Sequence, residues 1–266
     1  MPKVSVNGVN LYYEIHGSGE PIVLFMGLGG NIAIWDIELI NALAERFKVI
    51  IFDNRGTGRS DMPDEEYSIE LFADDSAALL DALGIESAYI LGASMGGMTA
   101  QEFALKYPRK CRKLILCCTL AGGENSVPPT GEALAILMSV KDLSPEEGTR
   151  AMRPAAFTKR FIETNGDWLE EKLKREIAYP TPPHAFERHL QAAMTFDAYD
   201  RLPRISCPTL VMTGVEDILI PARNSEILAQ RIPGAKLILF DNSAHGFMSE
   251  RRDGVLAAIF QFIEEG

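Results

Sequence analysis

The sequence predicts an α/β fold built on a mostly parallel, eight-stranded sheet flanked by helices. Short apolar runs of strand length alternate with helical patterns along most of the chain. Most of these runs are almost continuously apolar, as expected for parallel strands that are covered on both faces. One long segment, residues 123–203, interrupts the alternation and carries helical patterns only, which predicts a helical insertion between two strands of the sheet.

The N-terminal residues predict a β-hairpin. Residues 3–7 and 10–15 flank the dipeptide Asn7-Gly8, which is typical of two-residue type I′ turns. The other six strands are predicted at the apolar runs 22–26, 48–52, 88–92, 113–117, 209–213 and 236–240. Helices outside the insertion are predicted at 35–46, 69–83, 95–107, 222–232 and 251–264. The third of these helices is expected to end at Tyr107, because a proline follows.

The predicted strands and helices assign the chain to one core domain with an insertion. Residues 1–122 and 204–266 form the core, and residues 123–203 form the helical insertion. The insertion contains the helical stretches GEALAILMSV and DWLEEKLKREIA. We expect its helices to be broken by the prolines at 128, 129, 145, 154, 180, 182 and 183.

Composition restricts the partners that this chain could have. It is 47% apolar and 24% charged, as is usual for globular proteins, and its formal net charge is −11. No basic patch is evident, which argues against a nucleic acid partner. No apolar run approaches the length of a membrane span, so no membrane association is expected. A small molecule is the expected partner, and the oligomeric state stays open, with a homo-oligomer among the alternatives.

The cysteines favour a reducing compartment. There are four, at positions 111, 117, 118 and 207, and none forms a C-x-x-C pair. Cys117 and Cys118 lie in an apolar run, so buried free thiols are favoured over a disulfide or a metal site. The N-terminus lacks the basic and apolar regions of a signal peptide, and a cytoplasmic location is expected. No cluster has metal-ligand spacing, so neither a metal nor another cofactor is expected.

A glycine-rich stretch, LGASMGGMTA at 91–100, joins the predicted strand 88–92 to the predicted helix 95–107. It contains the pattern G-x-S-x-G with Ser94 at its centre. Small residues on both sides let the backbone take a strained turn that exposes the serine at the carboxyl end of the strand, where open α/β sheets bind ligands. The N-terminus of the helix favours developing negative charge. We therefore predict that Ser94 is a catalytic nucleophile.

A serine hydroxyl is a weak nucleophile without a base. The chain has only four histidines. His245 follows the last predicted strand, on the same rim of the sheet as Ser94, and is predicted to be the base. His16, His184 and His189 are expected to be surface histidines.

The base in turn needs a carboxylate to orient it. Glu216 and Asp217 lie just beyond the predicted strand 209–213. Asp217 is favoured, and Glu216 is the alternative, because adjacent side chains point in different directions. The resulting chain order is serine, aspartate, histidine, which differs from the orders of chymotrypsin and subtilisin.

With these residues in place, the sequence resembles the α/β-hydrolases, in particular the small ester and lactone hydrolases that carry a cap. The resemblance spans nearly the whole chain. Beyond the serine turn it rests on F-M-G-L-G-G (25–30), D-N-R-G-T-G-R-S (53–60), G-V-E-D-I-L-I-P (214–221) and A-H-G-F-M-S-E (244–250). The segments GASMGGMTAQ and MGLGG…W are similar to those of 3-oxoadipate enol-lactonases and carboxylesterases. The resemblance implies an α/β-hydrolase fold in which the insertion is the variable cap.

The resemblance also implies an oxyanion hole formed by the backbone amides of Leu28 and Met95. Two positions depart from the pattern. Met26-Gly27 stands where many relatives carry His-Gly, and Thr57 replaces a histidine common in the D-x-R-G-x-G motif. Because the donors are backbone amides, the hole is expected to survive, without the hydrogen bonds that a histidine would make behind it. The D-N-R-G-T-G-R-S segment is expected to be a structural turn near the site.

These residues predict a serine hydrolase of the carboxylesterase or lactonase type that cleaves small, fairly apolar substrates through an acyl-enzyme. A serine nucleophile argues against haloalkane dehalogenases and epoxide hydrolases, which use an aspartate. A C–C bond hydrolase, a cofactor-free perhydrolase and a proline-iminopeptidase-like peptidase use the same triad and remain alternatives. A non-catalytic small-molecule receptor on the same fold is a further alternative from a different class.

Substrate preference is expected to depend on the insertion. Its aromatic residues Phe157, Phe161 and Trp168 are expected to form the core of the insertion more than the wall of a pocket. A peptidase would need acidic residues there to hold a substrate amine. The candidates are Glu146, Glu147, Glu163 and Asp167.

Overall fold

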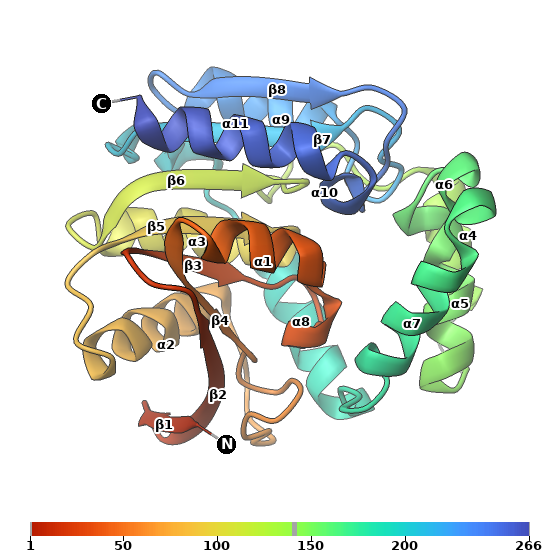
Figure 1. Ribbon diagram of the computed structural model, residues 1–266, viewed down its shortest axis with the longest axis horizontal. Helices are drawn as coiled ribbons and strands as arrows, with labels where there is room; N and C mark the ends of the chain where they lie inside the picture. The colour runs from red at the N-terminus through yellow and green to blue at the C-terminus, as the bar shows by residue number, and fades with distance from the viewer. Residues whose placement is uncertain (1, 140–142, 266) are drawn as a thin grey trace.

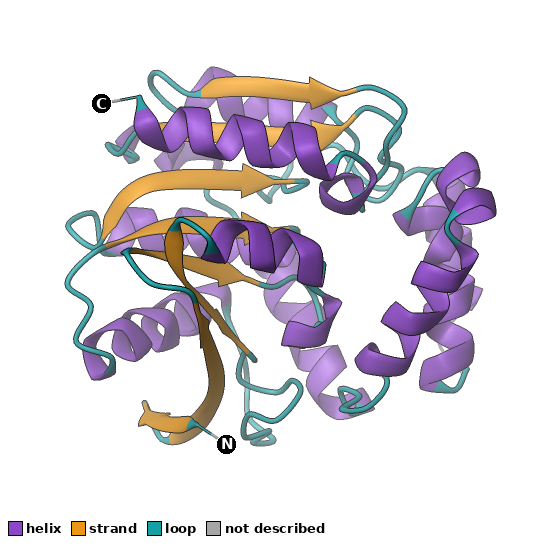
Figure 2. Ribbon diagram, viewed as in Figure 1, coloured by secondary structure: helices purple, strands orange, loops and turns teal. Residues whose placement is uncertain are grey.

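The computed structural model describes residues 2–139 and 143–265 and confirms the predicted α/β fold (Figures 1 and 2). Eight strands form one sheet in the order β1-β2-β4-β3-β5-β6-β7-β8. From β1 to β8 the strands are Lys3–Val6, Val9–His16, Glu20–Phe25, Phe47–Phe52, Ala88–Ala93, Cys111–Cys117, Thr209–Gly214 and Lys236–Phe240. The β1–β2 and β2–β4 pairs are antiparallel, and all later neighbours in this order are parallel.

The first two strands form the predicted hairpin. Val6 pairs with Val9, so only Asn7 and Gly8 make the turn. Both have positive φ, 44° and 80°, as a type I′ turn requires. The prediction from this dipeptide is therefore confirmed.

Helices cover both faces of the sheet. One face is covered by α1 (Ile37–Ala44) and α11 (Arg252–Glu264), and the other by α2 (Ile69–Ala82), α3 (Met95–Lys106) and α9 (Arg223–Arg231). Under α3, Phe25 packs edge-on against Phe52 and Phe103, with ring centroids 5.7 and 5.6 Å apart. All three rings are buried, and each stabilises the fold by about 1.5–3 kcal/mol through the apolar area removed from water.

Helices joined by loops make up the described residues of the insertion between β6 and β7 (Figure 1). Its helices are α4 (Gly131–Ser139), α5 (Pro145–Ala156), α6 (Lys159–Thr164), α7 (Gly166–Glu176), α8 (Pro183–Thr195) and the 3₁₀ helix η2 (Tyr199–Arg204). The expectation that prolines break these helices was wrong at Pro154, and the other six prolines lie in loops or begin a helix. Pro145 and Pro183 lie in the first turn, where no backbone N–H donor is needed, and Pro154 lies inside α5. Val140, at the end of the predicted GEALAILMSV helix, lies outside the described residues.

Two short helices were not predicted, η1 (Ile32–Ile34) and α10 (Phe247–Glu250). The first follows β3 and the second follows β8, so both lie just past the carboxyl ends of strands. Asn31 caps η1 by accepting a hydrogen bond from the Ala33 amide. Helices this short give too little periodicity for a sequence pattern to reveal them.

The four cysteines are free, as predicted. Cys111, Cys117 and Cys118 are buried, whereas Cys207 is half-buried. The Sγ atoms of Cys111 and Cys207 lie 3.6 Å apart. Because the two residues are 96 positions apart in the chain, their spacing in the sequence gave no sign of this contact.

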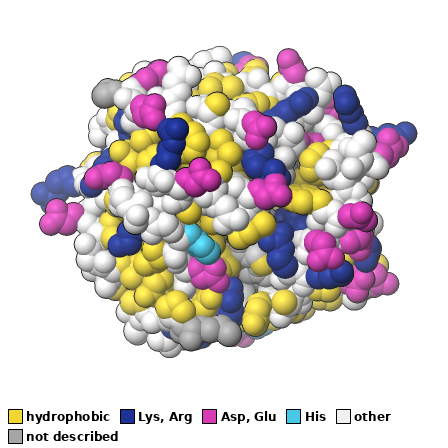
Figure 3. Space-filling model, in the orientation of Figure 1, with side chains coloured by type: hydrophobic (Ala, Val, Ile, Leu, Met, Phe, Trp, Pro, Cys, Tyr) yellow, Lys and Arg dark blue, Asp and Glu magenta, His cyan; other side chains and the backbone are white. Residues whose placement is uncertain are grey.

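The surface is mixed in charge. On the face shown in Figure 3, acidic and basic side chains lie side by side. Many form exposed ion pairs, such as Arg150–Glu146 at 3.0 Å, which contribute little to stability because water screens them. Among the described helices, none has both the length and the apolar character needed to cross a membrane.

Candidate active site

Ser94 occupies a strained turn between β5 and α3. Its backbone angles are φ 56° and ψ −125°, a region that side-chain-bearing residues rarely adopt. The flanking glycines make the turn sterically feasible. A Cβ atom on Gly92 would overlap the carbonyl oxygen of Gly96, and one on Gly96 would overlap that of Phe25. The turn leaves Ser94 half-buried at the carboxyl edge of the sheet.

Asp217 and His245 form a hydrogen-bonded pair at the same edge. Asp217 Oδ2 lies 2.7 Å from His245 Nδ1, and Asp217 Oδ1 accepts hydrogen bonds from the amides of Leu219 and Ile220 at 2.9 and 2.8 Å. The carboxylate is fully buried and the imidazole is 18% exposed. Because the carboxylate accepts a hydrogen bond from the protonated Nδ1, Nε2 is left as the basic nitrogen of His245. Glu216, the alternative partner, is exposed to solvent.

The pair changes the basicity of the histidine. Burial alone would lower the pKa of His245, but the negative charge of Asp217 and its hydrogen bond outweigh burial, and the pKa is raised above the ordinary value. The protonated imidazole is therefore stabilised. A base that must hold a proton during part of a reaction benefits from this arrangement.

The sheet brings the three residues to one edge. Ser94 follows β5, Asp217 follows β7 and His245 follows β8, and these strands run parallel with only β6 between the first two. Within the described part of the chain, Ser94 Oγ makes no hydrogen bond to His245. Bonds between a nucleophile and its base are often long before substrate binds and tighten in the complex.

The loop after β3 faces the serine. A Cβ atom on Gly27 would lie 3.0 Å from Ser94 Cβ. Gly27 also begins a tight turn, because the Gly30 amide donates to its carbonyl at 3.1 Å. Gly29, the third residue of the turn, has φ +61°, as a type II turn requires. Leu28 therefore sits at the second position of a turn that lies against the candidate nucleophile.

The amides of Leu28 and Met95, predicted to form the oxyanion hole, donate to no other group in the described part of the chain. Leu28 is half-buried in the loop, and Met95 is the first residue of α3. No acceptor for either amide is found among residues 2–139 and 143–265. The first amides of a helix have no partner within the helix and attract negative charge.

The D-N-R-G-T-G-R-S segment supports this loop from behind. Asp53 Oδ1 accepts from the Ile32 amide at 2.7 Å, and Asp53 Oδ2 accepts from the Arg59 amide at 2.8 Å. Asn54 Nδ2 donates to the Met26 carbonyl at 3.3 Å. Asp53 is completely buried, and this burial raises its pKa. The segment thus has a structural role, joining its own turn to the loop that faces Ser94.

The insertion holds the same loop from the other side. Thr181 Oγ1 donates to the Gly29 carbonyl at 2.7 Å. Asn31 Nδ2 donates to the carbonyls of Glu176 and Tyr179, both at 3.0 Å. The loop after β3 is thus hydrogen-bonded to the segment between α7 and α8.

The expectation that His189 is a surface histidine was wrong. It lies on the inner face of α8 and is completely buried, with its ring against Tyr67 and Phe72. Its Nε2 lies 2.7 Å from the Arg55 carbonyl, and the Gly29 amide donates to its Nδ1 at 3.5 Å. Burial lowers the pKa of His189 to about 4. The inner face of α8 is set by loops more than 100 residues away in the chain, which the local pattern could not reveal.

The insertion also contacts the loop that carries the candidate base. Glu250 Oε1 accepts from the amide and the hydroxyl of Thr158 at 2.9 and 2.7 Å, and Oε2 accepts from the Ala244 amide at 2.6 Å. The Gly246 amide donates to the Ala156 carbonyl at 2.6 Å. Glu250 belongs to the motif A-H-G-F-M-S-E, and its place there was the only sequence signal for this role.

The aromatic residues of the insertion pack on one another. Phe157 and Phe161 stack with ring centroids 5.1 Å apart, and Trp168 meets both edge-on at 6.1 and 5.6 Å. Each pair is worth about 0.5–1.5 kcal/mol beyond the area it buries. These rings contribute to the core of the insertion, as the sequence predicted.

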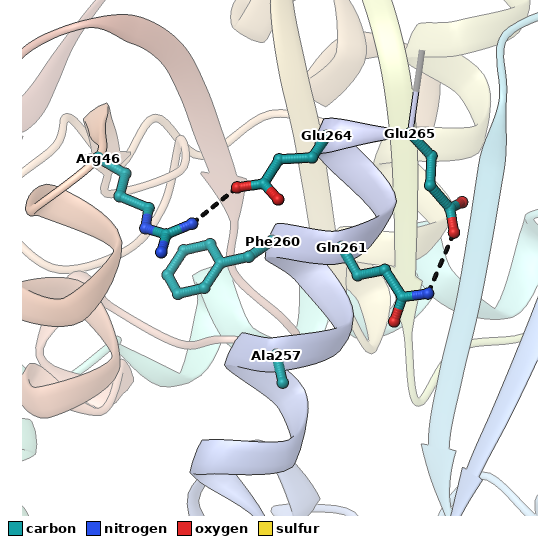
Figure 4. A pocket seen from close by; sticks show the side chains of 6 residues that line it. All are labelled: Arg46, Ala257, Phe260, Gln261, Glu264 and Glu265. Atoms are coloured by element: carbon teal, nitrogen blue, oxygen red, sulfur yellow. Dashed lines mark hydrogen bonds and ion pairs between the residues drawn. The ribbon is translucent and has the colours of Figure 1, made fainter.

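A surface groove of about 470 Å³ lies elsewhere (Figure 4). It is lined by Arg46, Ala257, Phe260, Gln261, Glu264 and Glu265. The C-terminal part of α11 forms one side, and Lys113 at the start of β6 donates to the Phe262 carbonyl there, so the groove lies toward the amino ends of the strands. It is therefore separate from the edge that carries Ser94. In the described residues, no cluster of His, Cys, Asp and Glu could hold a metal ion.

Comparisons with known proteins extend over nearly the whole chain. Residues 20–251 match the sequence model of the family described as alpha/beta hydrolase fold. A protein of Azorhizobium caulinodans named "Putative carbamate hydrolase RutD" is 34% identical over 95% of this chain and 94% of its own length. The enol-lactonase structure from Burkholderia xenovorans LB400 has a TM-score of 0.88 at 27% identity and covers 99% of this chain and 100% of its own. A thermophilic esterase structure from Thermogutta terrifontis has a TM-score of 0.84 at 28% identity, covering 100% and 99%.

Proposed function

Because the chain belongs to the α/β-hydrolase fold family and is a hydrolase, we propose that it is a serine hydrolase that cleaves carboxylic esters or lactones. The observation that carries the proposal is the 2.7 Å Asp217–His245 pair at the edge where the strained turn presents Ser94. A buried carboxylate that orients an imidazole at the same edge as a half-buried serine is an arrangement that can activate a hydroxyl nucleophile. The similarity to an enol-lactonase and an esterase supports the same substrate class.

In the proposed mechanism, His245 Nε2 removes the proton from Ser94 while Ser94 Oγ attacks the carbonyl carbon. The amides of Leu28 and Met95 bind the resulting oxyanion, and each such donor is worth about 10²-fold or more in rate. His245 then gives its proton to the leaving alcohol as the acyl-enzyme forms. A water molecule, deprotonated by the same histidine, attacks the acyl group and releases the acid. In a lactone, the alcohol and the acid belong to one product.

We further propose that the insertion, residues 123–203, is a cap that determines which substrates reach Ser94. Its contacts support this role, since it is hydrogen-bonded both to the loop after β3 and to the loop that carries His245. The expected substrates are small and fairly apolar. A small molecule is thus the proposed partner. We also propose a cytoplasmic location, because the four cysteines are free.

Carbamates are a second candidate substrate class, favoured by the 34% identity to the protein named as a carbamate hydrolase. The same nucleophile and oxyanion amides would attack a carbamate carbonyl, and the leaving group would be an alcohol or an amine. Comparing kcat/KM for p-nitrophenyl acetate and p-nitrophenyl N-methylcarbamate separates the two classes. A higher value for the carbamate would favour carbamate hydrolysis.

The peptidase alternative has less support. Two of its acidic candidates have structural partners, because Glu146 pairs with Arg150 and Glu147 closes the N-terminal cap of α5 with Ser144. Glu163 and Asp167 are exposed. A carboxylate that binds a substrate amine would be expected to point into a cleft without a partner of its own.

The proposal is tested by steady-state hydrolysis of p-nitrophenyl esters from acetate to long acyl chains. The Ser94→Ala variant gives the background rate. Turnover that exceeds this background and is greatest for short chains supports a hydrolase of small esters or lactones. A folded protein with no turnover above the variant would contradict the proposal and favour another acyl substrate or a receptor.

A further inference from the structure

The turn Gly27–Gly30 needs external contacts to hold one shape. Three of its four residues are glycines, which have more conformational freedom than any other residue. Rotation of the central peptide, between Leu28 and Gly29, converts one type of tight turn into another. The hydrogen bond from Gly30 to Gly27 closes both types and does not select between them. The type of turn therefore depends on what binds the central peptide. The Leu28 amide belongs to the adjacent Gly27–Leu28 peptide, so it keeps its place only while the turn as a whole is held.

His189 provides the contact to that peptide. Within residues 2–139 and 143–265, its Nδ1 is the only acceptor of the Gly29 amide, at 3.5 Å. Its Nε2 lies 2.7 Å from the carbonyl oxygen of Arg55. A carbonyl can only accept and an amide N–H can only donate, so Nε2 carries the proton and Nδ1 is the acceptor. The two neighbours thus fix one neutral tautomer of the ring.

The imidazole is itself held rigidly. It is completely buried, and its centroid lies 4.8 Å from that of Phe72 and 5.6 Å from that of Tyr67. The backbone that accepts from it belongs to Arg55, whose guanidinium is buried and paired with Asp75 at 2.9 Å. A ring fixed on three sides can hold a flexible glycine turn in one orientation, which is how enzymes keep reactive geometry in place.

We infer that His189 is a positioning residue: through the Gly29 amide it holds the turn Gly27–Gly30, and so the Leu28 amide, in the orientation that receives an oxyanion. This inference rests on the proposed function. The side chain comes from α8 of the insertion, so the insertion contributes to the catalytic geometry as well as to substrate access. Met26, whose side chain is a thioether, has no group that could donate a hydrogen bond to the turn.

The alternative is that His189 only stabilises the fold. A structural role would change the melting temperature in proportion to the loss of packing, but it would leave kcat of the folded fraction unchanged. If His189 positions the turn, replacing it lowers kcat with little effect on KM, because an oxyanion exists only after attack on the carbonyl. The same replacement also weakens the binding of a trifluoromethyl ketone, because this inhibitor forms an oxyanion when it reacts with Ser94. Its affinity should fall by the same factor as kcat.

The experiment compares His189→Phe, which keeps an aromatic ring without nitrogen, with His189→Gln, whose amide can both donate and accept. His184→Gln is the matched control, since His184 is an exposed histidine on the same helix. For each variant of the full chain, kcat and KM for p-nitrophenyl acetate and the affinity for a trifluoromethyl ketone are measured. Hydrogen exchange of the Gly29 amide is followed by NMR in the same samples.

For His189→Phe we expect kcat to fall by about 10- to 100-fold, with KM changed by less than about 3-fold, and faster exchange at Gly29. His189→Gln should restore much of the loss, and His184→Gln should match the wild type. Unchanged kcat in both His189 variants, or unchanged Gly29 exchange, would overturn the inference. If His189→Phe does not fold, His189→Leu, whose side chain also has no hydrogen-bonding group, replaces it in the same measurements. If wild-type turnover does not exceed that of Ser94→Ala, the proposed function fails, and Gly29 exchange alone still shows whether His189 holds the turn.

Discussion

Gly27 lies so close to Ser94 that a methyl group on Gly27 would be 3.0 Å from Ser94 Cβ and 3.5 Å from Ser94 Oγ. The Gly27→Ala substitution should therefore push the turn and the serine apart. We expect kcat for p-nitrophenyl acetate to fall by about 10-fold or more, because small displacements of reacting groups have large effects on rate. The measurement is steady-state kinetics together with the melting temperature.

Gly148→Ala is the matched control for this substitution. A Cβ atom there meets nothing within 4 Å, and the residue lies inside α5, where alanine is the better helix former. The control should keep wild-type kcat and be slightly more stable. Equal kcat for Gly27→Ala and the wild type would show that the two residues tolerate a larger separation.

The pH dependence of kcat/KM should report the Asp217–His245 pair. The pKa of His245 is raised above 6.5 by Asp217, and the neutral ring is the active base, so activity should rise with pH through a midpoint above 6.5. Asp217→Asn removes the charge and leaves burial unopposed, so the midpoint should move down and the plateau should fall by about 10³-fold or more. A midpoint that is the same in both proteins would assign the titration to another group.

The same pair should affect stability in a defined direction. Because the folded-state pKa of His245 is raised, the folded state binds more protons than the unfolded state between the two pKa values. The contribution of the protonated His245–Asp217 pair to the free energy of unfolding is therefore fully present below pH 6.5 and is lost as pH rises through the raised pKa. Urea denaturation of the wild type and Asp217→Asn across this range measures the difference.

His189 should make the fold sensitive to acid. Its folded-state pKa is about 4, against an ordinary value of 6.5, so the unfolded state binds the extra proton first as pH falls. The contribution of neutral His189 to the free energy of unfolding is fully present above pH 6.5. It should decrease by about 3 kcal/mol as the pH falls through the folded-state pKa. The difference in urea stability between wild type and His189→Phe should shrink over this interval. A constant difference would contradict the lowered pKa.

Glu250 should couple the insertion to the base. It accepts three hydrogen bonds, two from Thr158 and one from the Ala244 amide. Glu250→Ala leaves these buried or half-buried donors without a partner, so we expect a loss of about 1–3 kcal/mol in unfolding free energy and a lower kcat/KM. Glu264→Ala is the control, because Glu264 forms an exposed ion pair with Arg46. A similar loss in both variants would rule out a specific role for Glu250.

The ends of the strands were the most predictable part of the molecule. The Asn7-Gly8 hairpin signal identified the first two strands, and the apolar runs that alternate with helical patterns identified the other six. Ser94, Asp217 and His245 were placed by the rule that residues following parallel strands meet at one edge. Adjacent carboxylates left a choice between Asp217 and Glu216. The structure makes that choice geometrically, because only Asp217 points to the imidazole.

The contacts that support the site could not be predicted. His189 was expected at the surface because nothing near it in the sequence shows which face of α8 is buried; its partners come from the segments around Gly29 and Arg55. Similarly, Pro154 was expected to break a helix, although it lies inside α5. A local pattern does not show that packing elsewhere can hold a helix together across a proline.

The central claim is that Ser94 forms an acyl-enzyme. The most direct measurement is mass spectrometry of the protein quenched with acid during turnover of p-nitrophenyl acetate, followed by proteolysis. We expect one acetyl group on the peptide that contains Ser94, and none in Ser94→Ala. Turnover without an acetyl group on that peptide, under conditions where deacylation limits the rate, or acetylation that persists in Ser94→Ala, would contradict it.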